Sequence, residues 1–113
     1  FIGSIMSYFG GPKQPAYSAS KGGVKNLVHS LACAYAADGV RVNGVAPGWV
    51  ITNLSKGARD DAVRNAQIMG RLPMGRWADP SEIADPIVFL CSDAARYITG
   101  SMLAIDGGYM SVG

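Results

Sequence analysis

The chain has 113 residues, of which 49% are hydrophobic and 16% are charged, a composition typical of a folded globular domain and not of a disordered segment. Ten basic and eight acidic side chains leave a net charge of +2, which gives no general electrostatic basis for binding nucleic acid or an anionic membrane. The fifteen glycines and six prolines are scattered along the chain, so we interpret them as turns between short elements. The length allows one domain at most.

Membrane, secretion and disulfide patterns are all weak in this sequence. The apolar run from Ile87 to Cys91 is far shorter than the ~20 residues of a bilayer-spanning helix, so no membrane span is predicted. The chain begins Phe1-Ile2-Gly3-Ser4, without Met or a signal-peptide pattern, and we expect that its beginning is missing. Cys33 and Cys91 are too few for a disulfide scaffold, which favours two buried, reduced thiols in a cytoplasmic protein.

The segment from Ala16 to Ala37 is predicted to be a long helix. It follows a Gly10-Gly11-Pro12 loop and ends at Asp38-Gly39, where glycine most easily takes the left-handed closing conformation. A β-branched run from Val40 to Ala46 comes next and ends at Pro47-Gly48, which predicts a buried strand leading into a loop. The apolar side chains of the helix recur on one face: Val24, Leu27, Val28, Leu31 and Tyr35.

The central part of the sequence is the least regular. There we predict a turn at Thr52-Asn53, an amphipathic helix from Asp60 to Met69, and mobility. Asp79-Pro80-Ser81-Glu82 then combines a capping acid, a proline at the first helical position and a Glu three residues after the cap, which predicts a helix start. Pro86 is expected to kink this helix or force a restart. Ser101 to Ile105 is predicted to be the last strand.

Strands that alternate with helices imply crossover connections and a parallel sheet. The sequence therefore predicts an α/β fold with three parallel strands, the first ending near Ser4. Parallel sheets need cover on both faces, which two major helices can barely supply. We interpret the chain as half of a doubly wound domain.

Tyr17 and Lys21 are four residues apart on the predicted long helix, so their side chains project from nearly the same face and can share a site. A phenol is a poor acid or base at neutral pH, and a nearby ammonium group favours its ionised form. The pair therefore suits proton transfer to or from an alcohol or carbonyl oxygen. A solvated helix pair with no chemical role has the same spacing, and for the motif alone that alternative stays open.

Four separated motifs occur together: Ser4, Tyr17 to Lys21, Val42 to Gly48, and Ile98-Thr99-Gly100 followed by Asp106-Gly107-Gly108. In this order and spacing they closely resemble the short-chain dehydrogenase/reductase family, and the resemblance covers essentially the whole chain. It implies a Rossmann-like doubly wound parallel sheet. It also implies an NAD(P)-dependent oxidoreductase that transfers hydride between nicotinamide and a secondary alcohol or ketone.

The resemblance assigns the chemistry residue by residue. Tyr17 would be the general acid or base, and Lys21 would favour the ionised phenol and hold the nicotinamide ribose. Ser4 would donate a hydrogen bond to the substrate oxygen; a strand-end serine that satisfies the backbone is its alternative. The implied catalytic residues are Ser4, Tyr17 and Lys21, and the implied cofactor-binding residues are Tyr17, Lys21, Pro47, Gly48, Val50 and Thr52.

The loop from Pro47 to Thr52 is expected to pack on the nicotinamide, with Thr52 and the backbone of Val50 fixing its carboxamide. Gly48 would permit close approach of the backbone, although a plain turn is the alternative. The implied substrate-binding residues are Ser4, Tyr17 and Trp49.

The sequence also departs from the family pattern. Family members carry a Gly-rich dinucleotide loop after the first strand and an Asn on the helix before the Ser-bearing strand, and neither is present here. We therefore expect residues 1–113 to be a single partial Rossmann-like domain, the catalytic C-terminal half without the dinucleotide-binding half, and to be inactive alone. The choice between NAD and NADP stays open, and a truncated, non-catalytic association module remains the alternative function.

The expected partners are a small alcohol or ketone substrate and further copies of the chain, with no nucleic acid and no membrane. The family resemblance implies a tetramer or dimer in which the long helix packs on its mate. The basic excess between Trp49 and Arg76 suggests a small polar substrate, neutral or anionic, and Gly75-Arg76-Trp77 resembles the sugar and sugar-acid dehydrogenases of the family; ketoacyl or simple ketone substrates are alternatives. His29 has no second ligand at suitable spacing, so no metal site is expected.

Overall fold

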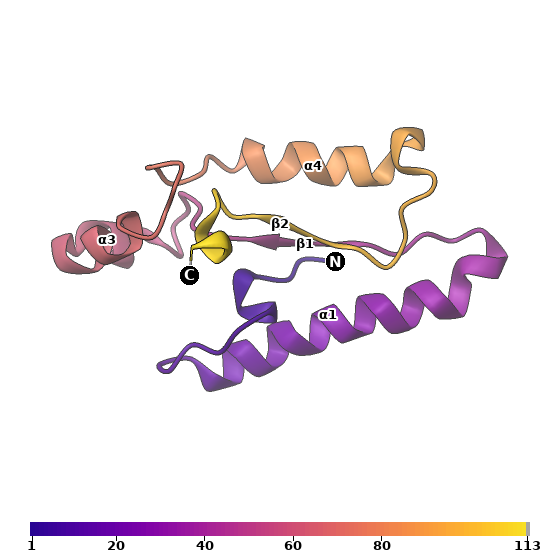
Figure 1. Cartoon of the computed structure of the whole chain (residues 1–113), viewed down its shortest axis with the longest axis horizontal. Coiled ribbons are helices and arrows are strands. Elements are labelled where there is room, and N and C mark those ends of the chain that lie inside the picture. Colours follow the sequence, from indigo (N-terminus) through magenta and orange to yellow (C-terminus); the bar gives the residue numbers. More distant parts are fainter. Residues whose placement is uncertain (113) are drawn as a thin grey trace.

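A computed structural model describes residues 1–112 as a parallel sheet with helices on both sides (Figure 1). Strand β1 (Gly44–Pro47) pairs in parallel with β2 (Met102–Ile105). Helix α1 (Pro15–Tyr35) lies on one side of the sheet and α4 (Ser81–Cys91) on the other. The predicted α/β fold, with a parallel sheet built by crossover connections, is confirmed.

The N-terminal segment supplies the third strand that the sequence predicts, but only as a single bridge. Ile2 pairs with Val45: the Gly3 N–H donates to the Val45 carbonyl at 2.8 Å, and the Val45 N–H donates to the Phe1 carbonyl at 3.0 Å. The short helix η1 (Ile5–Ser7) then ends the extended backbone. The regular sheet is therefore one strand thinner than predicted.

Helix α1 confirms the long helix predicted for residues 16–37. It begins with Pro15 in its first turn and continues beyond Tyr35 as the short helix η2 (Ala36–Asp38), which Gly39 closes in the left-handed conformation at φ 76°. Only Val28 and Ala32 of this helix are buried. The rest of the described chain therefore covers only a narrow stripe of α1.

Strand β1 is shorter than predicted, because it begins at Gly44 and not at Val40. Just before β1, hydrogen bonds of the Asn43 side chain take the place of backbone hydrogen bonds between the two strands. The Asn43 side chain donates to the Ile98 carbonyl at 2.8 Å, and its amide oxygen accepts from the Ser101 N–H at 3.0 Å. Asn43 thereby aligns the chain entering β1 with the chain entering β2.

Arg41 reinforces the same end of the sheet. Its guanidinium donates to the carbonyl of Leu90 at 2.7 Å, of Ile98 at 3.2 Å and of Ser92 at 3.3 Å. Leu90 lies in the last turn of α4, where carbonyls have no helical partner and a cation is favoured. One side chain therefore fastens the C-terminus of α4 to the chain entering both strands.

The helix predicted from Asp60 to Met69 is present but begins two residues later than predicted, and a separate short helix precedes it. Helix α2 (Lys56–Asp60) ends at Asp61, whose backbone is extended, and helix α3 (Ala62–Met69) follows. The Asp61 carboxylate accepts a hydrogen bond from the Arg64 N–H at 3.0 Å. Because Asp is a favoured N-cap, it starts a new helix here instead of continuing the first.

The predicted start of α4 is confirmed. The Asp79 carboxylate accepts hydrogen bonds from the Ser81 N–H at 3.0 Å and the Ser81 hydroxyl at 2.7 Å, and these bonds hold the pKa of Asp79 below its ordinary value. Of the two outcomes expected at Pro86, a kink or a restart, the restart does not occur, since α4 runs without interruption to Cys91. The missing amide of Pro86 removes only the bond to the Glu82 carbonyl, early in the helix.

The largest buried cluster lies where chain segments leave the carboxyl edge of the sheet. Its members are Ile5, Ala58, Ile68, Leu72 and Tyr109. The two cysteines lie outside it: both are free, as expected, but both are exposed, so the predicted burial is wrong. Cys33 follows the buried Ala32 and is turned ~100° away around the helix. No helix among residues 1–112 is long and apolar enough to cross a membrane.

Candidate functional site

Three segments leave the sheet at one edge, because the N-terminal segment, β1 and β2 run parallel. Ser4 follows the first segment, Gly48 follows β1 and Asp106 follows β2. Open α/β sheets bind their ligands beyond the carboxyl ends of the strands. This edge is therefore the candidate site, and it gathers segments that are far apart in the sequence.

Ser4 is buried at this edge and caps η1. Its hydroxyl oxygen accepts a hydrogen bond from the Met6 N–H at 3.2 Å, so the backbone-capping alternative is present in the structure. A hydroxyl that accepts one hydrogen bond keeps its own hydrogen for donation. The cap therefore fixes the side chain of Ser4 without using the hydrogen that a substrate oxygen would need.

The Ser4 turn is fastened to α1 at Lys21. The Ser4 N–H donates to the Ser7 hydroxyl oxygen at 3.2 Å, and the Ser7 hydroxyl donates to the Lys21 carbonyl at 2.6 Å. Ser7 is buried, and the sequence reasoning missed it. The Ser4-x-x-Ser7 spacing of a capping box is the signal that could have found it.

Tyr17 and Lys21 lie one turn apart on α1, as predicted. The Lys21 ammonium lies 5.7 Å from the centre of the Tyr17 ring and donates to the Ile2 carbonyl at 3.0 Å. An ammonium group has three donors, so this contact leaves others available. Tyr17 as a residue is 40% exposed, which leaves it open to a small molecule. Lys21 thus connects the phenol-bearing helix to the segment that carries Ser4.

Gly48 is required by contact within the chain itself. A Cβ at this position would lie 2.8 Å from the Asp106 Cα, too close for any other residue without a shift of the backbone. The Gly48 N–H donates to the Ile105 carbonyl at 3.0 Å. The close approach that the sequence predicts at Gly48 is therefore made by the β2 exit, which accounts for this glycine without a ligand.

The backbone of Val50 faces away from its neighbouring strand. The Ala78 N–H donates to the Trp49 carbonyl and the Ile51 N–H donates to the Ala78 carbonyl, both at 2.9 Å. In a parallel bridge with this pattern, the N–H and C=O of the residue between the two bonds point to the opposite side. The amide of Val50 is therefore directed out of the bridge, as a group that binds a carboxamide would be.

Thr52 shapes a tight turn with Ser55. The Ser55 N–H donates to the Thr52 hydroxyl oxygen at 3.3 Å, and the Ser55 hydroxyl donates to the Val50 carbonyl at 2.6 Å. This confirms the predicted turn at Thr52-Asn53, and it leaves the hydroxyl hydrogen of the exposed Thr52 available for donation. Ser55 is a second residue that the sequence reasoning missed.

Trp49 packs in an aromatic cluster. Its ring meets Trp77 edge to face at 5.3 Å and Tyr109 at 6.1 Å between ring centres. The indole N–H is buried without a hydrogen-bond partner among the described residues. Trp49 therefore packs among aromatic side chains, and its role in substrate binding stays a prediction.

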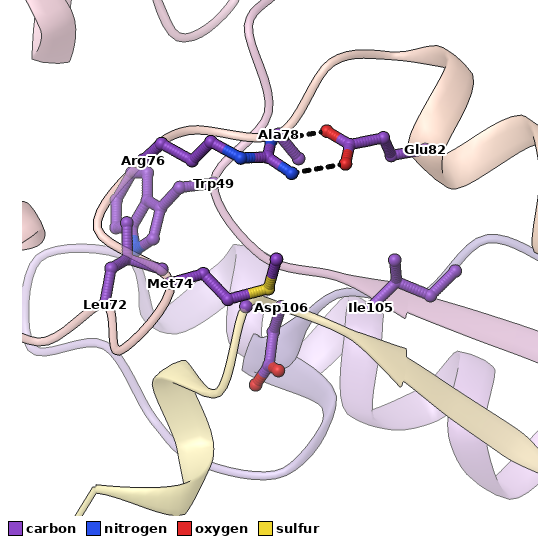
Figure 2. A pocket seen from close by; sticks show the side chains of 9 residues that line it. Trp49, Leu72, Met74, Arg76, Ala78, Glu82, Ile105 and Asp106 are labelled. Atoms are coloured by element: carbon purple, nitrogen blue, oxygen red, sulfur yellow. Dashed lines mark hydrogen bonds and ion pairs between the residues drawn. The ribbon is translucent and has the colours of Figure 1, made fainter.

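A cavity of about 70 Å³ lies beside this loop, between the β2 exit and the start of α4 (Figure 2). Arg76 and Glu82 close one side of it through two hydrogen bonds of 2.7 and 2.6 Å, and the carboxylate of Asp106 points away from that pair. The Arg76 guanidinium lowers the pKa of Glu82 to about 2. This cavity has room for only a few waters, and its lining includes none of Ser4, Tyr17 or Lys21, so it is not the predicted substrate pocket.

Most basic residues of the central segment are used inside the chain. Lys56 pairs with Asp60, Arg76 pairs with Glu82, and Arg59 donates to the Thr52 carbonyl at 2.9 Å. Arg71 lies 4.5 Å from the centre of the Tyr109 ring. These contacts weaken the argument that the local basic excess faces an anionic substrate. Among residues 1–112, no cluster of His, Cys, Asp or Glu could hold a metal, and His29 is exposed.

Comparison with known proteins identifies the family. The family model described as enoyl-(acyl carrier protein) reductase matches residues 1–110. A 2-dehydro-3-deoxy-D-gluconate 5-dehydrogenase of Pseudoalteromonas atlantica is 44% identical over 110 residues, which are 97% of this chain and 43% of that protein. A cis-4-hydroxycyclohexanecarboxylate dehydrogenase of Sinomonas cyclohexanicum is 47% identical over 98% of this chain and 44% of its own length.

A solved structure agrees with these sequences. The gluconate 5-dehydrogenase of Burkholderia cenocepacia, in complex with NADP and tartrate, superposes with a TM-score of 0.95 at 34% identity, over 99% of this chain and 44% of that one. The chain thus spans less than half the length of the relatives it matches. Its fold, its motifs and these matches agree, and the chain belongs to the short-chain dehydrogenase/reductase family.

Proposed function

We propose that this chain carries the catalytic half of an NAD(P)-dependent oxidoreductase that interconverts a secondary alcohol and a ketone. The observation that carries the proposal is the fastening of the Ser4 turn to α1 at Lys21, one helical turn from the exposed phenol of Tyr17. A hydrogen-bond donor, a proton-transferring phenol and an ammonium group are thereby held at one edge of the sheet. General acid–base chemistry on an alcohol needs these groups.

Each residue has a role that its geometry supports. In oxidation, the Tyr17 oxygen accepts the proton of the substrate hydroxyl, and in reduction it returns a proton to the carbonyl oxygen. The Ser4 hydroxyl donates to that same oxygen as charge develops on it. The Lys21 ammonium, 5.7 Å from the centre of the Tyr17 ring, supports proton transfer at the phenol, and its remaining donors would hold the ribose of the cofactor. NAD or NADP, when bound, accepts or supplies the hydride.

The residues after β1 fit the nicotinamide end of such a cofactor. The outward-facing amide of Val50 and the hydroxyl of Thr52 suit a carboxamide, which has both an acceptor and a donor. Pro47 and Gly48 would form the adjacent wall. Nothing in the chain selects between NAD and NADP, so both remain in the proposal.

We assign residues 1–113 to a single partial Rossmann-like domain that packs against further protein carrying the rest of the dinucleotide site. A second cavity of about 530 Å³ supports this, because it opens at the amino end of β1 beside the apolar side chains of Ile2, Val45 and Ile87. The chain has a radius of gyration of 15.1 Å, against about 13 Å for a compact domain of this length. Both features suit a part of a larger enzyme, and the two free cysteines suit a cytoplasmic location for it.

A sugar acid is the proposed substrate class. The supporting observation is that relatives across the whole chain are named for hydroxy or keto acids, including a gluconate derivative and a hydroxycyclohexanecarboxylate. These compounds share a carboxylate and a secondary hydroxyl or keto group. The assignment does not depend on the basic residues of the central segment, since most of them make contacts within the chain.

The test uses the full-length protein with NAD⁺ and with NADP⁺. Sugar acids, neutral polyols and hydroxyacyl thioesters are offered in turn, and turnover is expected with sugar acids. Tyr17→Phe should nearly abolish turnover while cofactor affinity, measured by fluorescence titration, stays close to that of the wild type. Activity confined to thioesters would refute the sugar-acid class. No turnover with any alcohol would favour the association module over the enzyme.

A further inference from the structure

We propose that Tyr109 is a positioning residue that holds the segments of the candidate site in register with one another. This inference rests on the oxidoreductase function proposed above. Tyr109 lies in the short helix η4 (Tyr109–Ser111), beyond the residues that the sequence analysis assigns to the site, and its residue surface is only 8% exposed.

The ring of Tyr109 contacts three segments, of which two border or contain site residues. Its centre lies 6.5 Å from that of Phe9, nearly parallel to it, and Phe9 belongs to the loop that follows the Ser4 turn. It lies 6.1 Å from the Trp49 ring, which sits between Gly48 and Val50. Its third neighbour is the guanidinium of Arg71, 4.5 Å from the ring centre, at the exit of α3.

The β2 exit fixes Tyr109 rigidly. Gly107 and Gly108 both have positive φ, at 61° and 84°, which other residues rarely adopt. The Asp106 carboxylate accepts from the Gly108 N–H at 3.0 Å and from the Met110 N–H at 2.9 Å. The Asp106-Gly107-Gly108 motif therefore bends the chain back so that Tyr109 inserts among the site-bearing loops.

Aromatic contacts at these distances favour offset-stacked and edge-to-face geometries, so a ring held by three partners restricts all of them. A guanidinium over a ring face adds an electrostatic attraction. Tyr109 is the residue that these aromatic and cation–π contacts share. Through it, the loop after Ser4 is linked to the loop at Trp49 and to the α3 exit. A shift of Tyr109 would move Ser4 relative to the Val50 loop, and misplacement of about 1 Å can cost about 10²-fold in rate.

The experiment compares Tyr109→Phe, Tyr109→Ala and Leu90→Ala in the full-length protein. Tyr109→Phe keeps the aromatic ring, so its kcat should stay within about twofold of the wild type. Ala should lower kcat by about 10²-fold at temperatures where the protein stays folded. Leu90 has the same 8% exposure but lies in α4, so Leu90→Ala should lower the melting temperature and leave kcat unchanged. An equal loss of kcat in Leu90→Ala, or full activity in Tyr109→Ala, would overturn the proposal.

A second measurement does not depend on turnover. With Trp77 and any tryptophan outside residues 1–113 replaced by Phe, Trp49 is the single tryptophan, and acrylamide quenching of its fluorescence reports its exposure. Tyr109→Ala should increase quenching, and Tyr109→Phe should not. Unchanged quenching in Tyr109→Ala refutes the positioning role. Increased quenching in a protein that turns over no alcohol would instead show that the oxidoreductase proposal has failed.

Discussion

At the residue scale, the Ser4 hydroxyl accepts one hydrogen bond within the chain, from the Met6 N–H, and its own hydrogen remains available for donation. Ser4→Ala removes that donor, and we expect turnover in the full-length enzyme to fall by about 10²- to 10³-fold, the usual effect of losing one donor to a developing oxyanion. Ser92→Ala is the matched control, because the Ser92 hydroxyl also makes one local bond, to the Phe89 carbonyl at 2.7 Å, but does so at the end of α4. Turnover within tenfold of the wild type in Ser4→Ala would exclude its assigned role.

Substitution by Ala should have opposite effects on the free energy of unfolding at Gly48 and at Gly23. A Cβ at Gly48 would press on the Asp106 backbone, so Gly48→Ala should lower the free energy of unfolding by about 1–3 kcal/mol. A Cβ at Gly23, in the middle of α1, has nothing within 4 Å, so Gly23→Ala should raise it by about 0.5–1 kcal/mol. Urea denaturation monitored by circular dichroism measures both. Equal effects of the two substitutions would contradict the close packing of Gly48.

At the element scale, the Arg76–Glu82 pair joins the central segment to the first turn of α4. The hydrogen bonds from Arg76 and from the Asp79 N–H lower the pKa of Glu82 from 4.5 to about 2. A carboxyl whose pKa is depressed on folding stabilises the folded chain above its unfolded pKa and loses that contribution as the pH falls through the folded one. The stabilisation is therefore present at neutral pH and declines between about pH 4.5 and pH 2.

Glu82→Gln should remove this pH dependence. The melting temperature of the wild type should exceed that of Glu82→Gln at pH 6, and the difference should close near pH 2. Asp85→Asn serves as the control, because Asp85 is exposed on the same helix and makes no ion pair among the described residues. The difference in melting temperature between the wild type and Asp85→Asn should not close as the pH falls. A difference between wild type and Glu82→Gln that stays constant with pH would refute the role of the ion pair.

The elements that could be predicted from sequence are those whose signals are local. The capping residues at Asp79 and Glu82, the left-handed Gly39 and the four-residue spacing of Tyr17 and Lys21 act through neighbouring backbone, so their patterns are sufficient. The short β1 could not be predicted, because its start is set by bonds from Asn43 to a distant part of the chain.

Other differences arise where two local preferences compete or where long-range packing decides. Asp61 is compatible with a helix interior and with an N-cap, and the structure uses it as a cap. Cys33 and Cys91 lie in apolar stretches, yet they fall on faces that the rest of the described chain does not cover. Tyr109 carries no motif at all, and its place among the site loops follows only from the three-dimensional return of the chain after β2.

At the scale of the whole molecule, an apolar stripe on α1 is left open. Leu27 and Tyr35 are 44% and 48% exposed, and with Leu31 they recur every four residues along one side of the helix. We expect the full-length protein to sediment as a dimer or tetramer at micromolar concentration, with this stripe in the interface. Leu27→Asp should shift it to smaller species, whereas Leu54→Asp, at a residue 91% exposed in the central segment, should not. A monomeric wild type would refute this assembly.

The pairing of β1 with β2 has a consequence for synthesis of the chain. Residues 44 to 47 are made before α2, α3 and α4, but their partners at 102 to 105 are made only afterwards. At ribosomal rates of about 5–20 residues per second, this edge waits roughly 3–12 seconds for its partner. During that interval Val45 and Ala46, almost fully buried in the final fold, lie on an open strand edge of the kind that pairs with other chains. The nascent protein is therefore exposed to edge-to-edge association with other chains until β2 has been made.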